Sequence, residues 1–373
     1  ERFGEGLDKP NNWLDNDMKT ICAGAGTPLD KARKIYAYVR DNITCTDHEA
    51  FYLTSTLKQV FTKRNGNVVD VNLLLVAMLR HEGMEADPVL LSTRDNGFTY
   101  ESYPILERFN YVICRLKIDD KKYCLDASHD YLGFNRLPEE CYNGHSRVVN
   151  AKMPEIVYLW ADSLREKKAT SVFIAASDSD KTKMEGTFQS KLGYFESTSV
   201  RNSIKAKGKE AFFKKVKAGY NLDIEIKNPV VDSIPQKDEP LTESYTFTFD
   251  KPADGMLYIN PMMGEGTKEN FFKSAERHYP VEMPYAVDEV YVFNLEVPEG
   301  YEVEELPKSA RVSLNETDGM FEYLVDKAEG HIRLMSHIKL NKATFLPEEY
   351  DSLRQWFGYI VKKHAEQVVL KKK

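Results

Sequence analysis

One segment constrains the fold more than any other: residues 68–81, VVDVNLLLVAMLRH, are apolar at almost every position. A surface helix shows an apolar stripe on one side only, whereas a helix that is apolar nearly all round must be covered by other elements. We therefore expect a buried central helix over Val68–His81, with Gly83 as its C-cap. Its apolar run is shorter than the roughly 18 residues that a membrane-spanning helix needs, and no longer run exists in the chain.

Weaker patterns surround this helix. Apolar residues at helical spacing predict a helix from Pro28 to about Asn42 and another from Leu53 to about Phe61. Residues 63–67, KRNGN, form a turn cluster before the central helix. After it, β-branched and apolar stretches predict strands at 86–92, 111–118 and 122–127, the last two forming a hairpin around Asp119-Asp120. Residues 1–30 and 130–160 are expected to be rich in loops.

The second half of the chain has a different period. Alternating apolar and polar residues predict strands, which include 171–175, 245–249, 290–297 and 332–338. Helical patterns interrupt them at 203–218 and 347–364. We predict an α+β core at 1–160, with a buried helix on an antiparallel sheet, and a mainly β, sandwich-like domain at 161–373.

Charge and cysteine content exclude several classes. There are 58 acidic and 51 basic residues, which give a net charge of −7 and argue against nucleic acid as the partner. Five scattered cysteines are too few for a disulfide scaffold, and pairing of Cys114 with Cys124 stays open. The sequence shows no signal-like segment, so it gives no location by itself.

Several short motifs, in order, resemble the transglutaminase-like superfamily, a branch of the papain-like thiol enzymes, over about residues 30–145. They are Gly66-Asn67-Val68-Val69-Asp70 before the central helix, the helix itself, Phe109-Asn110-Tyr111-Val112, and Tyr123-Cys124-Leu125-Asp126-Ala127-Ser128. The resemblance implies a thiol at the helix N-terminus, where the helix dipole favours a thiolate. It also implies a histidine base on the following strand and an aspartate on the next that orients the histidine.

The later part of the chain resembles a β domain that follows this core in exported proteins of Bacteroidetes. The similarity lies in Arg277-His278-Tyr279-Pro280-Val281, in Pro298-Glu299-Gly300-Tyr301, in Leu306-Pro307-Lys308-Ser309 and in residues 350–370. It implies a protein that is exported, periplasmic or associated with the outer membrane. Those relatives usually carry another β domain before the core, so this chain is expected to be a fragment.

The departures from the motif decide the functional prediction. Val68 stands at the nucleophile position and Tyr111 at the base position, and only Asp126 matches. Valine has no lone pair, and a phenol with a pKa near 10 is a poor base at neutral pH. We predict a catalytically inactive protein that binds a peptide, glycan or protein in a groove past Asn67, Val68, Tyr111 and Asp126. We expect Asp126 to accept a hydrogen bond from Tyr111, and we expect no cofactor and no metal.

Two other functions stay open. One is an active cysteine protease, amidase or transglutaminase-like enzyme with a thiol not yet placed, for which Cys45, Cys114 and Cys124 lie nearest. The other is an interaction module of a larger exported protein, with its function in the β domain.

Two further residue groups have simpler interpretations. His129, Cys141 and His145 match no established zinc spacing. The lysine-rich stretch 205–220 carries an apolar stripe at Phe212, Phe213, Val216 and Tyr220. It fits a helix packed on the β domain with a solvated lysine face better than a membrane-surface helix.

Overall fold

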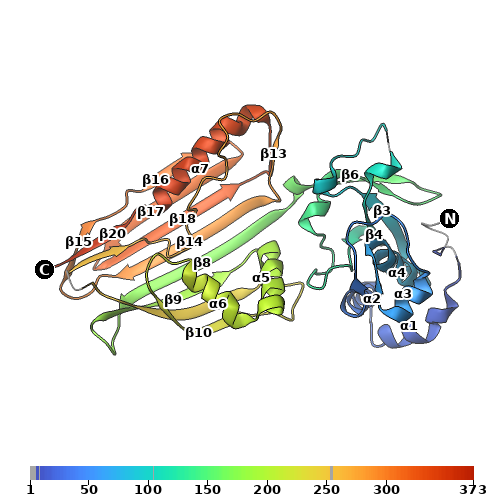
Figure 1. The fold of residues 1–373 in the computed structure, drawn as a ribbon, viewed down its shortest axis with the longest axis horizontal. Helices are drawn as coiled ribbons and strands as arrows, with labels where there is room; N and C mark the ends of the chain where they lie inside the picture. The colour runs from blue at the N-terminus through green and yellow to red at the C-terminus, as the bar shows by residue number, and fades with distance from the viewer. Residues whose placement is uncertain (1–5, 8, 104, 253–254) are drawn as a thin grey trace. The chain divides into compact units, whose positions relative to one another are not determined.

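The computed structural model describes residues 6–7, 9–103, 105–252 and 255–373 of the chain. It divides into two compact units, Glu1–Ala161 and Asp162–Lys373 (Figure 1). The first unit mixes helices and strands and the second is mainly β, as the sequence predicts. The described part of the chain contains no helix long and apolar enough to cross a membrane.

The predicted central helix, α4 (Val68–His81), forms the core of the first unit. Every residue from Val68 to Leu79 is buried, which explains why the segment has no polar face. Helix α2 (Pro28–Asn42) matches its predicted bounds, and the side chain of its N-cap residue, Thr27, accepts a hydrogen bond from the backbone amide of Asp30. Both helices carry their start signals in the local sequence, so their bounds do not depend on distant contacts.

A five-stranded antiparallel sheet packs on α4, with strand order β5-β4-β3-β6-β7. Its strands are β3 (Glu85–Leu91), β4 (Tyr111–Ile118), β5 (Lys121–Leu125), β6 (Asn143–Val148) and β7 (Glu155–Trp160). The predicted hairpin is β4–β5, in which Cys114 lies opposite Leu125 and Arg115 opposite Cys124. Cys114 and Cys124 therefore point to opposite faces of the sheet, and all five cysteines are free.

Three local predictions for this unit are wrong. The helix expected at 53–61 is α3 (Leu57–Lys63), because Thr56 caps its N-terminus and residues 50–56 form a loop. Helix α1 (Asp15–Ile21) lies where only loops were expected, and β6 and β7 occupy part of the supposedly loop-rich stretch 130–160. Two short parallel strands, β1 (Thr44–Cys45) and β2 (Asn65–Gly66), lie just before α4 in the fold.

An eight-stranded sheet dominates the second unit, with strand order β10-β11-β9-β8-β14-β18-β17-β16. Its strands are β8 (Arg165–Ala176), β9 (Lys183–Lys191), β10 (Glu225–Asp232), β11 (Thr242–Asp250), β14 (Ala286–Glu296), β16 (Ala310–Ser313), β17 (Gly319–Ala328) and β18 (His331–Leu340). Burial alternates along β9 and β18, so one face of the sheet is covered while the other is more open. Gly186 is required on the covered face, because a Cβ there would meet the ring of Phe247 at 2.3 Å.

Helices and a small sheet cover the buried face (Figure 1). They are α5 (Tyr194–Lys207), α6 (Lys209–Ala218), α7 (Tyr350–His364), β12 (Met256–Ile259), β15 (Tyr301–Glu305) and β20 (Val368–Lys372), with a short pair β13 (Val281–Glu282) and β19 (Thr344–Phe345) beside them. The single helix predicted at 203–218 is instead the end of α5 followed by α6. The chain breaks at Gly208, whose φ of 82° is not helical.

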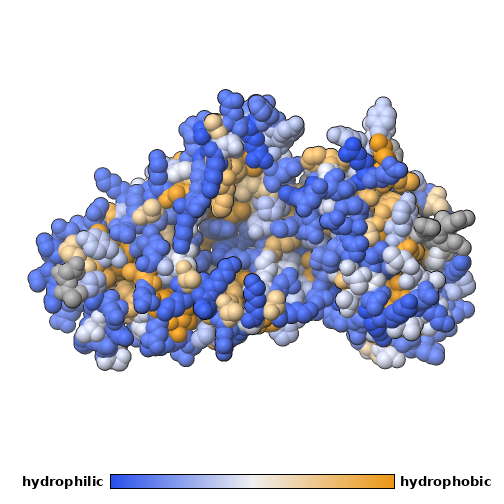
Figure 2. Space-filling model, viewed as in Figure 1, coloured by the Kyte–Doolittle hydropathy of each residue, from blue (hydrophilic) through white to orange (hydrophobic). Residues whose placement is uncertain are grey.

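The lysine-rich helix α6 packs on this domain. Phe213 is buried, Phe212 and Val216 pack against the same core, and the lysines remain outside. This is the arrangement preferred from the sequence. On the face shown in Figure 2, hydrophilic side chains cover most of the surface and hydrophobic ones gather in small patches.

Candidate functional site

The structure brings the predicted site residues together beneath the surface of the first unit. Tyr111 begins β4, Asp126 follows β5, and Asn67 and Val68 start α4. Asn67 is 5% exposed, Tyr111 is 1% exposed, and Val68 and Asp126 are fully buried. A ligand on the surface would therefore not contact these four side chains directly.

Tyr111 is held in place by three partners. Its hydroxyl donates to Oδ2 of Asp126 at 2.7 Å, as expected from the sequence, and lies 3.0 Å from Nε2 of His129 and 3.2 Å from the Ser128 hydroxyl. Burial, and after it the charge of Asp126, raises the pKa of the phenol well above its usual range. The phenol therefore stays protonated at neutral pH, whereas a general base must be able to accept a proton there.

Asp126 has partners for both carboxylate oxygens. Its Oδ1 accepts hydrogen bonds from Nδ2 of Asn72 at 2.8 Å and from the Ser128 backbone and hydroxyl. Asn72, on the first turns of α4, also accepts a hydrogen bond from the Ala127 backbone. Each polar atom of this buried network is satisfied, which is what a structural role for Asp126 requires.

A loop of residues 46–56 lies over the N-terminus of α4. The Val68 amide donates to the Asp47 carbonyl at 2.8 Å, and Nδ2 of Asn67 donates to the Tyr52 carbonyl at 2.9 Å. The backbone amide of Thr54 donates to Asp70, which also caps the helix together with Asn67. The N–H groups of Val68 and Asp70, which at an open helix N-terminus would be available to stabilise a thiolate or an oxyanion, are therefore already hydrogen-bonded.

Gly66 fixes the close approach between this turn and the helix. A Cβ at residue 66 would come within 2.5 Å of the Cβ of Asp70. The Gly-Asn pair of the motif thus has a packing role in this chain that persists without the nucleophile.

Three side chains near this centre were not assigned to one site from the sequence. Cys45 Sγ lies 3.6 Å from Nδ1 of His48, and the ring of His48 stacks on His129 with centroids 4.2 Å apart. The His129 side chain is 29% exposed and forms the link to Tyr111. Cys45 ends β1, His48 lies in the loop that follows it, and His129 lies in the turn after β5, so no fixed spacing relates the first two residues to His129. The nearest signal is the position of His129, three residues after Asp126.

The cysteine environments oppose thiol activation. Burial is the main cause that raises the pKa of Cys45 to about 12 and that of Cys124 to about 11. The charge of Asp126 adds to the effect at Cys45. Burial also holds the pKa values of Cys114 and Cys141 well above the usual range for a thiol. A reactive cysteine needs the opposite shift.

The two histidines considered as zinc ligands, His129 and His145, contact different residues. His145 Nδ1 lies 2.8 Å from the Thr99 hydroxyl, and His129 contacts Tyr111. Within the described ranges, no group of three or more His, Cys, Asp or Glu side chains is arranged to hold a metal ion.

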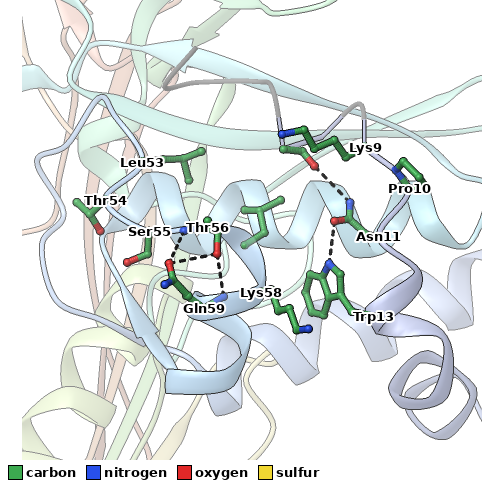
Figure 3. A pocket seen from close by; sticks show the side chains of 12 residues that line it. Lys9, Pro10, Asn11, Trp13, Leu53, Thr54, Ser55, Thr56, Lys58 and Gln59 are labelled. Atoms are coloured by element: carbon green, nitrogen blue, oxygen red, sulfur yellow. Dashed lines mark hydrogen bonds between the residues drawn. The ribbon is translucent and has the colours of Figure 1, made fainter.

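A pocket of about 570 Å³ with a mixed polar and apolar lining lies beside the loop that covers α4 (Figure 3). Trp13 and Asn11 form one side, joined by a hydrogen bond of 3.0 Å from the indole to the amide oxygen. Thr54, Ser55, Thr56 and Gln59 form the other side, and Lys9 and Lys58 also line the pocket. Thr54 links the pocket to Asp70 and so to the N-terminus of α4.

Comparison with known families supports the resemblance seen in the sequence. Residues 18–123 match the profile of the transglutaminase-like superfamily. This stretch is a transglutaminase-like domain. Residues 255–370 match DUF3858, described as a domain of unknown function with a solved structure. No curated protein matches the sequence significantly.

A solved structure shares the fold of the whole chain. It is a crystal structure described as a "putative protease" from Parabacteroides distasonis, with a TM-score of 0.59 and 13% sequence identity. The match covers 98% of this chain and 57% of the other, so this chain spans little more than half the length of its structural neighbour. At this identity the likeness establishes the fold, and the activity of the neighbour is not carried over with it.

Proposed function

We propose that the transglutaminase-like domain is a catalytically inactive binding module that holds a peptide, glycan or protein partner in a bacterial envelope. One observation carries the proposal: Val68 stands at the position where the family motif has its nucleophile. Its side chain is buried, and its backbone amide donates a hydrogen bond to the carbonyl of Asp47. Neither Tyr111 nor Asp126 has an unsatisfied polar atom left for chemistry on a substrate. A fold kept without its catalytic groups retains a shaped surface on which a partner can bind.

The contact surface would lie above the buried centre. His48 and His129 are both partly exposed, and they stack above Tyr111 and Asp126. The ligand would then contact the two imidazoles. These rings would be held in position by the buried residues beneath them, which are Asn67, Val68, Tyr111 and Asp126. The pocket of mixed lining beside the loop offers an indole, two lysines and several hydroxyl and amide groups, which suit hydrogen-bonding ligands such as peptides and glycans.

A binding screen tests this proposal. The full chain is probed against cell-wall peptides, glycans and envelope proteins, beside an unrelated protein of similar charge. The double variant H48A/H129A should weaken binding of any ligand found, whereas H331A, on an exposed histidine of the other unit, should not. If no ligand binds better than to the unrelated protein, or if the double variant binds as well as the wild type, the proposed surface is wrong.

A second candidate function rests on the Cys45–His48 pair. The 3.6 Å separation between the sulfur and Nδ1 is the arrangement of a thiol beside a base. The raised pKa of Cys45 argues against it, because thiolate is the attacking species. Hydrolysis or acyl transfer of peptide amides that C45S and H48A both abolish would favour this candidate over the binding module.

The envelope location is part of the proposal and rests only on the resemblance of the later part of the chain to a domain of exported Bacteroidetes proteins. Fractionation of cells that express the natural full-length gene product tests it. We expect the protein in the periplasmic or outer-membrane fraction. Its recovery in the cytoplasmic fraction alone would contradict the proposed envelope location.

A further inference from the structure

A second pocket, of about 370 Å³, lies between α5, α6 and the covered face of the large sheet. Lys168 of β8, Glu243 and Tyr245 of β11, Glu196 of α5 and Glu265 after β12 all line it. Three carboxyl groups therefore converge with one partly buried lysine. This pocket lies wholly within the second unit and is unrelated to the site described above.

The lysine in this pocket is already matched. Lys168 Nζ lies 3.0 Å from Oε1 of Glu196 and 2.9 Å from Oε2 of Glu265. These two ion pairs explain the raised pKa of the lysine against the opposing effect of burial. Lys168 is therefore accounted for by the two carboxylates that flank it.

Glu243 lacks such a partner. It is only 6% exposed and lines the cavity, yet none of the described residues forms a hydrogen bond or an ion pair with its carboxylate. A buried polar group normally finds a partner, and a buried charge without one is costly. Burial, then the charges of Glu265 and Glu196, raises the pKa of this carboxyl to about 7, with Lys168 opposing.

Aromatic and aliphatic side chains form another part of the wall. The hydroxyls of Tyr220 and Tyr245 lie 2.6 Å apart, so one of them donates to the other. Phe212 and Val216 of α6 add apolar surface, and Lys215 of the same helix is exposed. Aromatic faces attract cations, and an apolar wall accommodates an aliphatic stem.

We propose that this pocket binds the cationic end of a ligand, an ammonium or guanidinium group on an aliphatic stem, with Glu243 as its counter-ion. The ligand supplies the N–H donors that Glu243 lacks, and its stem contacts Phe212 and Val216. An anionic ligand would be repelled by three carboxyl groups, and Lys168 could offer it little attraction because it is already paired. The inference does not depend on the function proposed for the transglutaminase-like domain.

Titration calorimetry with small probes tests the proposal on the full chain. The probes are N-acetyl-lysinamide, N-acetyl-argininamide and the neutral N-acetyl-norleucinamide, at about pH 8, where most of Glu243 is ionised. One or both cationic probes should bind at least about tenfold more tightly than the neutral one, since a hydrogen bond to a charged group has that strength. The stronger of the two identifies the head group.

Two variants locate the binding. E243Q keeps the shape of the side chain and should reduce the affinity of the cationic probe about tenfold or more, toward that of the neutral probe. The control is E269Q, which changes an exposed carboxylate of the same unit that pairs with Lys273. This variant should leave the affinity of the cationic probe unchanged. Circular dichroism of both variants confirms that they are folded.

The pH dependence of the wild type gives a test that needs no variant. Because the cation binds the ionised form of Glu243, its affinity should fall from about pH 8 to about pH 6, and binding at the lower pH should release a proton. The groups that face Glu243 are Lys168, Glu196, Glu265 and the Tyr220–Tyr245 pair. Equal affinity for the neutral and cationic probes, or full affinity in E243Q, would overturn the proposal.

Discussion

The hydroxyl of Tyr111 donates a hydrogen bond of 2.7 Å to Oδ2 of Asp126, so the side chains at two positions of the family motif stabilise each other. The phenol fills the site where the resemblance places an imidazole. The aspartate keeps a partner, and its other oxygen stays bound to Asn72. Tyr111, Asp126 and Asn72 therefore form a closed hydrogen-bond network inside the first unit.

Removing the Tyr111 hydroxyl should reduce stability. In Y111F, Oδ2 of Asp126 loses its donor while it remains buried, which we expect to lower the free energy of unfolding by about 1–3 kcal/mol. Urea denaturation of the full chain measures this change. The control is Y158F. It removes the hydroxyl of an exposed tyrosine, which donates a hydrogen bond to Glu101, and it should leave the unfolding midpoint unchanged. Equal midpoints for Y111F and the wild type would show that the network contributes nothing.

The thiols should react slowly with iodoacetamide. Burial raises the pKa of Cys22 as well as those of Cys45, Cys114, Cys124 and Cys141, so little thiolate exists at neutral pH in the native protein. Peptide mass spectrometry after alkylation between about pH 5 and pH 9 should show no site that reacts rapidly below neutrality. The unfolded protein, in which all five sites react as ordinary thiols, is the control. Fast alkylation of Cys45 in the folded state would instead support the thiol enzyme.

Stability should fall in mild acid because of His364. Burial lowers the pKa of this imidazole to about 4, while the unfolded chain binds a proton near the ordinary value of 6.5. As the pH drops from about 6.5 to about 4, the unfolded state binds the proton first. The free energy of unfolding therefore falls by on the order of 3 kcal/mol.

H364N removes this titration. Its amide oxygen can replace Nδ1 as the acceptor for the Thr267 amide. Urea unfolding at a series of pH values should show a flatter acid limb for H364N than for the wild type. H331N, at an exposed histidine, should keep the wild-type slope. A wild-type slope in H364N would assign the acid sensitivity to other groups.

Glu243 should have the opposite pH dependence. Its folded pKa of about 7 lies above the ordinary value of 4.5, so the folded state holds the proton longer and its stability falls as the pH rises between these values. E243Q should therefore be more stable than the wild type above about pH 7, by on the order of 3 kcal/mol, and the gain should vanish near pH 4. Thermal unfolding at the two pH values measures the difference. A variant less stable than the wild type at both would mean that Glu243 has a partner.

The central helix and its neighbours follow from the sequence because their signals are local. Thr27 and Asn67 cap α2 and α4, and the all-apolar pattern of α4 predicts its burial without any knowledge of its neighbours. The misplaced start of α3 shows the limit of this reasoning. An apolar stripe at residues 53–61 fits a helix, but Thr54 binds Asp70 instead, and the distant contact decides the conformation of the loop.

The sequence alone determined which side chains, Val68 and Tyr111, stand at the motif positions of the nucleophile and the base, and the identity of a side chain fixes what it can donate or accept. Only the tertiary structure decided that Val68 is covered by the loop from Asp47, because loop closure depends on packing across the chain. It also brought His48 onto His129 and left Glu243 without a partner. Such contacts join segments with no fixed spacing, and their burial and charge, which set the pKa values, exist only once the chain has folded.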